Sequence, residues 1–154
     1  MKRRTFVQTT LALPVLSALP AIAAEESDLI YLSPVKSDGT LSRCQAEVWY
    51  AGDGGNFYVV TAADAWRAKA VGLGLTDTKV WIGDVGQWQR SRGKYLELPS
   101  VQARASLVTD AVEHARLLGI FGNKYTAEWG SWGPRFKKGL ADGSRVMLRY
   151  TPAV

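Results

Sequence analysis

The segment Asn56–Leu75, which reads NFYVVTAADAWRAKAVGLGL, is the one around which the rest of the chain is arranged. It begins as a β-strand, and because both faces of that strand are largely apolar, we expect it to be covered on both sides. After Thr61 the period changes to that of a helix, with Asp64 as the candidate N-cap and an end expected near Gly72 and Gly74. Three residues share one face of this helix: Trp66, Ala70 and Leu73.

Two basic residues near the start of this helix, Arg67 and Lys69, are poorly placed for a purely structural role. The N-terminal end of a helix dipole favours negative charge, and each misplaced cation costs about 0.3–1 kcal/mol. A bound anion would remove that cost. The turn is therefore either an anion-binding site or the start of a solvated helix with two unfavourable charges.

The first 24 residues have the features of an export signal. A basic head, Lys2-Arg3-Arg4, precedes a mildly apolar run, and Ala21-Ile22-Ala23 offers a signal-peptidase pattern with cleavage after Ala23 or Ala24. The order Arg3-Arg4-Thr5-Phe6-Val7 resembles a twin-arginine signal, which implies a periplasmic or otherwise exported protein, often one that acquires a cofactor before export. The alternative is an uncleaved N-terminal anchor, although two prolines in the run oppose a stable membrane-spanning helix.

Composition limits the remaining chain, residues 25–154, to a single domain of about 130 residues. The signal carries three of the 19 basic residues and none of the 14 acidic residues, so the net charge of this domain is +2. A broad nucleic-acid-binding surface is therefore not expected. Cys44 is the only cysteine, which excludes an internal disulfide. Stability then depends on packing, with dimerisation or a bound ligand as further sources.

Short strands precede the central stretch. Leu29–Leu32 has the composition of one strand, and Cys44–Tyr50 alternates as a second. Asp53-Gly54-Gly55 is a hairpin turn that leads into the strand starting at Asn56. Three consecutive strands joined in this way predict a meander.

Two further strands, Lys79–Val85 and Val101–Val108, are expected after the helix. Between them, Gly86–Tyr95 would place Trp88 and three basic residues on one face if it were a strand. Such a face holds a phosphate or a nucleic acid, or it is a solvated hairpin whose cations protect a sheet edge.

A helix is predicted from the capping box Asp110-x-x-Glu113 to about Phe121. Its buried face is expected to carry Ala111, Ala115 and Leu118. His114 is the only histidine and borders that face. Without a second histidine or a cysteine nearby, it indicates packing rather than a metal site.

The segment Gly122–Leu140 is rich in glycine and aromatic residues, and Pro134 opposes a long helix there. We expect either a lid over a planar ligand or a packed loop. A final strand, Arg145–Thr151, points Val146, Leu148 and Tyr150 to one side.

Several catalytic patterns are missing from the sequence. It has no G-x-S-x-G elbow, no P-loop, no clustered Cys/His set, no calcium loop and no carboxylates spaced as an acid/base couple. We therefore assign no catalytic residue and no metal ligand. The pattern favours a reaction carried by a cofactor.

The order of these elements is that of a small antiparallel barrel. Together with GGNFYVVTA…WRAKAVGL, VWIGDV and the strand Arg145–Pro152, it resembles the split β-barrel superfamily of flavin-binding proteins, which includes pyridoxamine 5′-phosphate oxidase-like and deazaflavin-dependent nitroreductase-like proteins. The resemblance covers roughly Leu29 to Pro152. It implies an α+β fold, a small split β-barrel of six to seven strands with two or three short helices. It also implies a homodimer with the cofactor at the subunit interface.

In that superfamily, a Thr or Ser ending the third strand and basic residues at the start of the next helix hold the cofactor phosphate. The matching positions are Thr61, Arg67 and Lys69, with Trp66 beside them. The oxidases have an adjacent Arg-Lys pair, whereas Ala68 intervenes here, and residues two apart on a regular helix do not face each other. Either the turn is irregular or only one of the two cations contacts phosphate. The resemblance implies FMN, with the deazaflavin F420 as the alternative.

Three functions remain open at this point. The first is an exported oxidoreductase that binds FMN or F420 and passes hydride between the ring and a small molecule stacked on Trp129 or Trp132. The second is a non-catalytic barrel module for a haem-like or other planar ligand. The third is a structural exported domain. None involves nucleic acid, a bound metal or stable membrane insertion after signal removal.

Overall fold

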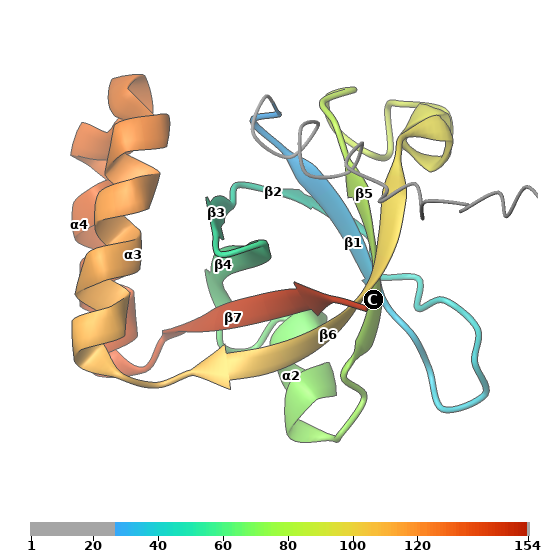
Figure 1. The fold of residues 1–154 in the computed structure, drawn as a ribbon, viewed down its shortest axis with the longest axis horizontal. Helices are drawn as coiled ribbons and strands as arrows, with labels where there is room; N and C mark the ends of the chain where they lie inside the picture. Colours follow the sequence, from blue (N-terminus) through green and yellow to red (C-terminus); the bar gives the residue numbers. More distant parts are fainter. Residues whose placement is uncertain (1–26, 154) are drawn as a thin grey trace, which may run out of the picture.

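The computed structural model describes residues 27–153, and the export signal expected at residues 1–24 lies outside them. Seven strands, three α-helices and one short 3₁₀ helix make up this part of the chain (Figure 1). In chain order they are β1 Ile30–Pro34, β2 Ala46–Val48, β3 Ala51–Asp53, β4 Asn56–Ala62, α2 Trp66–Gly72, β5 Asp77–Ile82, η1 Lys94–Glu97, β6 Ser100–Val108, α3 Ala111–Lys124, α4 Thr126–Asp142 and β7 Arg145–Pro152.

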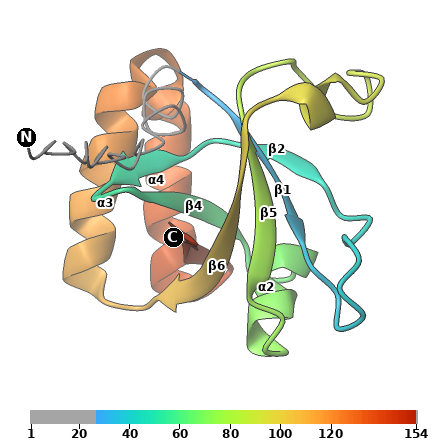
Figure 2. The same ribbon diagram turned by 45° about the vertical axis from the view of Figure 1, so that its right-hand side comes forward.

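The strands form one antiparallel sheet in the order β2-β1-β5-β6-β7-β4-β3. The sheet curls into a half-barrel, and the link between β2 and β3 connects its two edges (Figure 2). This is the small α+β split β-barrel expected from the sequence. The predicted meander is wrong, because β1 pairs with β2 and β5 whereas β4 pairs with β3 and β7.

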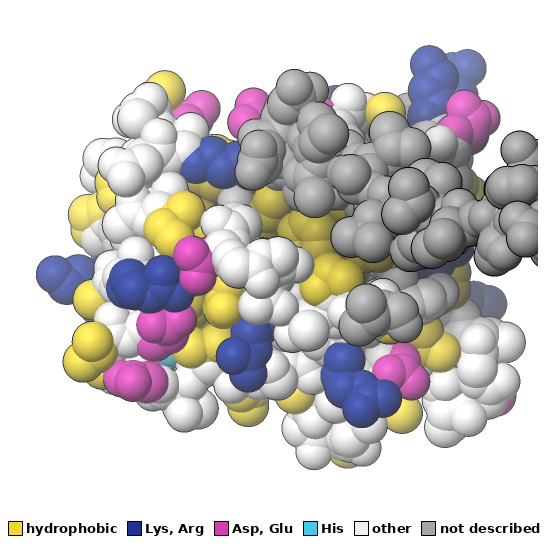
Figure 3. Space-filling view, viewed as in Figure 1, with side chains coloured by type: hydrophobic (Ala, Val, Ile, Leu, Met, Phe, Trp, Pro, Cys, Tyr) yellow, Lys and Arg dark blue, Asp and Glu magenta, His cyan; other side chains and the backbone are white. Residues whose placement is uncertain are grey.

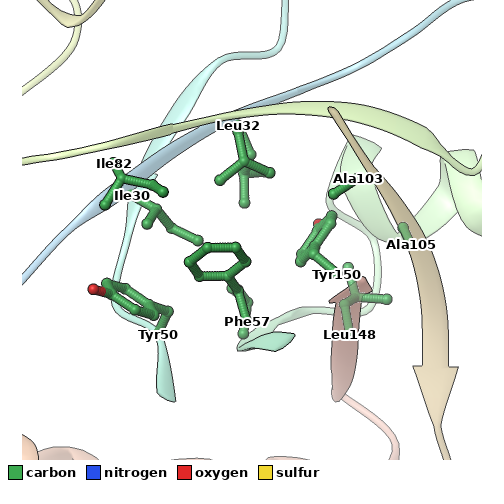
Figure 4. Close-up of a cluster of buried hydrophobic side chains, with 11 residues drawn as sticks. Ile30, Leu32, Tyr50, Phe57, Ile82, Ala103, Ala105, Leu148 and Tyr150 are labelled. Carbon is green, nitrogen blue, oxygen red and sulfur yellow. The ribbon is translucent and has the colours of Figure 1, made fainter. Parts of the chain in front are cut away.

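Strand β4 is covered on both faces, as its apolar alternation predicts. Phe57 and Val59 point into the barrel, where Phe57 lies at the centre of a cluster with Tyr50, Leu148 and other apolar side chains (Figure 4). On the other face, Tyr58 and Val60 pack beneath α3 and α4. The curled sheet therefore separates two cores, one inside the barrel and one under the helices.

The helix after β4 differs in detail from the prediction. Ala65, not Asp64, is the N-cap, and no side chain caps the helix. The helix ends at Gly72, as expected. Its apolar face is shifted, because Ala68 and Ala70 are buried while Leu73 is 68% exposed. The small alanine side chains let this short helix lie close against the barrel.

Other strands also begin or end at residues different from those predicted. The strand expected at Cys44–Tyr50 is the short β2, and the chain then bends before β3. The strand expected at Lys79–Val85 is β5, which begins and ends earlier. Gly86–Tyr95 is neither a strand nor a hairpin but a series of turns leading into η1, so its cations do not share a strand face. Trp88 instead packs against Tyr95.

Helix α3 is longer than predicted and buries a different face. Asp110 caps it, but the carboxylate accepts from the Val112 N–H, and no capping box forms because the Glu113 carboxylate binds Arg116. The buried residues are Leu117 and Phe121. Ala111 and Ala115, which were expected to be buried, are exposed. The face is set by the position of β3 and β4 rather than by alanine spacing.

The largest correction concerns Gly122–Leu140, which is helical and not a loop or a lid. It contains the end of α3 and most of α4, with Pro134 inside the helix. Close packing explains the glycines: a Cβ on Gly122 or Gly133 would lie 2.7 or 2.8 Å from the Trp129 indole ring. That ring stacks on Phe121, with ring centroids 6.2 Å apart and planes 9° apart. Tertiary packing here overrides the poor helix propensity of glycine and proline.

Across residues 27–153, we find no helix that combines the length and the apolar character needed to cross a membrane.

Candidate functional site

The turn between β4 and α2 is fixed by backbone hydrogen bonds. The Ala63 N–H donates to the Ser144 carbonyl (2.9 Å), which ties the turn to the start of β7, and the Ala65 N–H donates to the Ala62 carbonyl (3.1 Å). Helix α2 has only seven residues, about two turns. Its dipole is therefore small, and the side chains around the turn decide what it can bind.

Thr61 lies at the end of β4 with its side chain on the same face as Phe57 and Val59, the barrel interior. It is 1% exposed, and its hydroxyl oxygen has no hydrogen-bond partner among the described residues. An unsatisfied buried hydroxyl costs about 1–3 kcal/mol. A ligand or water that reaches this oxygen would recover that energy.

Arg67 turns part of its guanidinium inward. Its Nε is buried and, within residues 27–153, has no hydrogen-bond partner. The Tyr150 hydroxyl, inside the barrel, is likewise buried without a partner. Burial raises the pKa of Tyr150 far above its usual range, and the Arg67 charge lowers it in part. Arg67 and Tyr150 therefore interact across the barrel end that α2 covers.

The other two expected site residues lie apart from this interior group. Trp66 begins α2 and is partly exposed, whereas Lys69 is exposed near the end of the helix. The structure thus brings Thr61 and Arg67 to the inner side of the turn and leaves Lys69 in solvent. This agrees with the expectation that residues two apart on a helix face different ways.

Two residues of this neighbourhood were not singled out from the sequence. Tyr150 is a fully buried polar side chain inside the barrel, and its alternation with Val146 and Leu148 indicates the inward direction. Cys44 is also close enough to Tyr150 to contribute electrostatically to the raised pKa of that tyrosine. The proximity of residues 44, 67 and 150 depends on strand register, which the sequence pattern does not give.

A groove of about 670 Å³ lies elsewhere, on the outer surface of β5 and β6 near the chain's last residues. Its lining includes the exposed ion pair of Asp77 and Arg104, whose charged atoms are 3.7 Å apart. None of the four expected cofactor contacts lines it. On the face viewed in Figure 3, basic and acidic side chains are intermixed. Among the described residues, no cluster of three or more His, Cys, Asp or Glu side chains is arranged to hold a metal ion.

Comparison with known proteins supports the fold. No protein-family model matches the sequence, and no curated protein matches it significantly. Solved structures do match. HutZ, the haem storage protein of Vibrio cholerae, is 15% identical with a TM-score of 0.59, and the match covers 88% of this chain and 90% of HutZ.

Two other solved structures share this fold. A Clostridium acetobutylicum protein related to general stress protein 26, of the pyridoxinephosphate oxidase family, is 12% identical with a TM-score of 0.56 and covers 86% of this chain and 80% of its own. A candidate 5-nitroimidazole antibiotic resistance protein of Bacteroides thetaiotaomicron is 8% identical with a TM-score of 0.60. That match covers 100% of this chain and 93% of the other. At these identities the comparisons establish the fold: the chain is a split β-barrel of the kind seen in pyridoxamine 5′-phosphate oxidase-like proteins.

Proposed function

We propose that the protein binds a flavin-type cofactor, FMN or alternatively F420, with its phosphate at the β4–α2 turn. The observation that carries this proposal is the pair of buried polar atoms at Thr61 and Arg67 that have no hydrogen-bond partner among residues 27–153. A hydroxyl and a guanidinium N–H both donate to phosphate oxygen, and hydrogen bonds to a charged acceptor are about twice as strong as neutral ones. The residues present therefore fit the phosphate of such a cofactor.

Each residue of the turn has a distinct role in this proposal. Thr61 donates from the end of β4, Arg67 supplies charge from the inner side of α2, and Trp66 offers an aromatic face beside them. Lys69 adds only solvent-screened charge. Thr61 is buried in this structure, so its contact with a phosphate requires the short helix α2, which packs mainly through two alanines, to move.

The bound ring would supply hydride chemistry toward a small-molecule substrate, which makes the protein an oxidoreductase. The chain itself binds and orients the cofactor and the substrate, and it excludes water from the site. We further propose that the protein is exported, on the basis of its first 24 residues, and that it is a homodimer, on the basis of the superfamily resemblance. Light scattering of the purified protein tests the dimer, and cell fractionation tests export.

The test of the cofactor proposal is a titration of the purified protein with FMN and F420, followed by absorbance and fluorescence quenching. Arg67→Met and Thr61→Val should each weaken binding at least about tenfold, which corresponds to about 1.4 kcal/mol. Lys69→Met is the matched control and should change binding less than about threefold, because that side chain is exposed. Absence of binding to both cofactors, or equal effects of the Arg67 and Lys69 changes, would contradict the proposal.

A second candidate is a non-catalytic module for a haem-like planar ligand, which the fold likeness to HutZ favours. His114 is the only histidine, and its Nε2 lies 2.6 Å from the Val108 carbonyl oxygen. That nitrogen therefore carries the proton, and only Nδ1 is left as a potential axial ligand. A haem spectrum on titration, without reduction of any electron acceptor, would support this candidate over the first.

A further inference from the structure

A second pocket, of about 310 Å³, lies at the end of the molecule opposite α2, where the corner between α3 and α4 meets the residues before β1 (Figure 1). An aromatic stack forms part of its wall: the rings of Trp49 and Tyr125 are 4.3 Å apart and nearly parallel. Lys124 lines the same pocket. This volume is at the lower end of the range for ligand pockets, about 300–1,000 Å³, and suits a small molecule.

Lys124, the last residue of α3, is held against ring faces rather than against a carboxylate. Its Nζ lies 3.4 Å from the centroid of the Tyr50 ring and 5.4 Å from that of Tyr125. It forms no ion pair with any residue between 27 and 153. Burial lowers the pKa of Lys124 to about 8, against the opposing effect of the Asp28 charge. The Tyr50 ring also attracts the charged amine, by about 0.5–2 kcal/mol, but no carboxylate of the described residues is in contact with it.

This environment is that of a nucleophilic lysine. Only the neutral amine attacks a carbonyl carbon, and desolvated lysines are the ones that form Schiff bases in proteins. At pH 7 a pKa of about 8 leaves on the order of a tenth of the amine neutral, against less than about a thousandth for an ordinary lysine. The pocket that Lys124 and Tyr125 line provides the space that a small carbonyl compound needs.

We propose that Lys124 is a carbonyl-reactive residue and that its pocket takes small uncharged aldehydes or ketones. The amine nitrogen attacks the carbonyl carbon and one proton moves to the oxygen, which gives a carbinolamine. Loss of water, with both amine protons leaving on the carbonyl oxygen, then gives the imine. Three carboxyl side chains line the same pocket, Asp28, Asp84 and Glu128, and they disfavour anionic carbonyl compounds by charge repulsion.

This site is separate from the β4–α2 turn and does not depend on a bound cofactor. The test incubates the full protein with glycolaldehyde and cyanoborohydride at pH 7.5, so that each imine is trapped as a stable secondary amine. Peptide mass spectrometry then measures the labelling rate at each lysine. Lys137, an exposed lysine of α4, is the internal reference within the same folded molecule.

Lys124 should be labelled at least about tenfold faster than Lys137, with a half-maximal rate near pH 8. A ratio below about tenfold overturns the proposal. Glyoxylate, an anionic aldehyde of similar size, should label Lys124 more slowly than glycolaldehyde does, relative to Lys137 in each reaction. Equal relative rates for the two aldehydes overturn the assignment to uncharged compounds. Lys124→Arg keeps the charge and should lose the fast-labelled site without changing the rate at Lys137.

Discussion

The Tyr125 hydroxyl accepts a hydrogen bond of 2.9 Å from the backbone N–H of Tyr50. It donates to the Asp28 carbonyl at 2.8 Å, and its ring stacks on Trp49. One side chain at the corner between α3 and α4 thus joins that corner to the link between β2 and β3 and to the residues before β1. The helical pair is attached to the barrel through this contact as well as through apolar packing.

Removing that hydroxyl should therefore destabilise the protein. Tyr125→Phe keeps the stack but leaves a buried N–H and a carbonyl without their partner, so we expect the free energy of unfolding to fall by about 1–3 kcal/mol. Urea denaturation measures it. Tyr58→Phe is the control, because the Tyr58 hydroxyl has no hydrogen-bond partner in the described part of the chain. A similar loss in both variants would count against a specific role for the Tyr125 hydrogen bonds.

Two glycines of α4 should respond oppositely to alanine. A Cβ on Gly133 would lie 2.8 Å from the Trp129 ring, and such overpacking costs about 1–3 kcal/mol. A Cβ on Gly130 meets no atom within 4 Å, so Gly130→Ala should stabilise the helix by up to about 1 kcal/mol. Thermal unfolding distinguishes the two. If Gly133→Ala is as stable as Gly130→Ala, then Trp129 is free to move and the packing explanation for α4 fails.

Stability should rise between about pH 8 and pH 10 and then fall. Lys124 loses its proton near pH 8 in the folded state but only near its ordinary value of 10.5 when unfolded, so the unfolded chain binds more protons in this window and the free energy of unfolding increases with pH. Burial raises the pKa of Tyr50 to about 12, so above pH 10 the unfolded tyrosines ionise first and stability declines.

Urea denaturation from pH 7.5 to 11 measures both slopes. Lys124→Met should abolish the rise and keep the decline, because it removes only the buried amine. A variant that retains the rise would show that another group is responsible. Tyr125, the other tyrosine whose ring lies close to the Lys124 amine, has its pKa raised by burial and titrates above the window of the rise.

The Tyr150 hydroxyl should behave unlike that of Tyr125. It is buried without a partner among the described residues, so Tyr150→Phe removes an unsatisfied polar group. We expect the free energy of unfolding to stay unchanged or to increase by up to about 1–3 kcal/mol. A loss of more than about 1 kcal/mol, measured by urea denaturation, would instead show that an internal water or ion satisfies this hydroxyl.

The parts of the fold that the sequence predicts are those in which local pattern and tertiary packing agree. The alternation in Asn56–Thr61 and Arg145–Thr151 reports burial on defined strand faces, and β4 and β7 are found there. Helix α4 was missed because glycine and proline disfavour helix locally, whereas the space they leave for Trp129 is visible only in three dimensions. The face of α3 was misassigned for the same reason, since the contacts of Leu117 come from distant strands.

The candidate site, like the fold, is predicted only in part by the sequence. Arg67 is indicated by its place near the start of the helix, whereas Thr61 is a candidate through the superfamily resemblance. Their relation to Tyr150 depends on the pairing of β4 with β7, in which Phe57 lies opposite Tyr150. The Lys124 pocket combines chain segments near residues 28, 49, 84 and 124. No local pattern connects these four segments.

Strand β7 lies between β6 and β4, although it is the last strand of the chain. Before it is synthesised, β2-β1-β5-β6 and β4-β3 are two partial sheets with no ladder between them. A ribosome-bound chain that stops before Arg145 therefore exposes two open strand edges, and both barrel cores lack one wall. The eight residues of β7 therefore supply both ladders that join the two partial sheets. While β7 is unpaired, the edges of β6 and β4 are open to pairing with other chains, so the docking of this one strand decides between a closed sheet and aggregation.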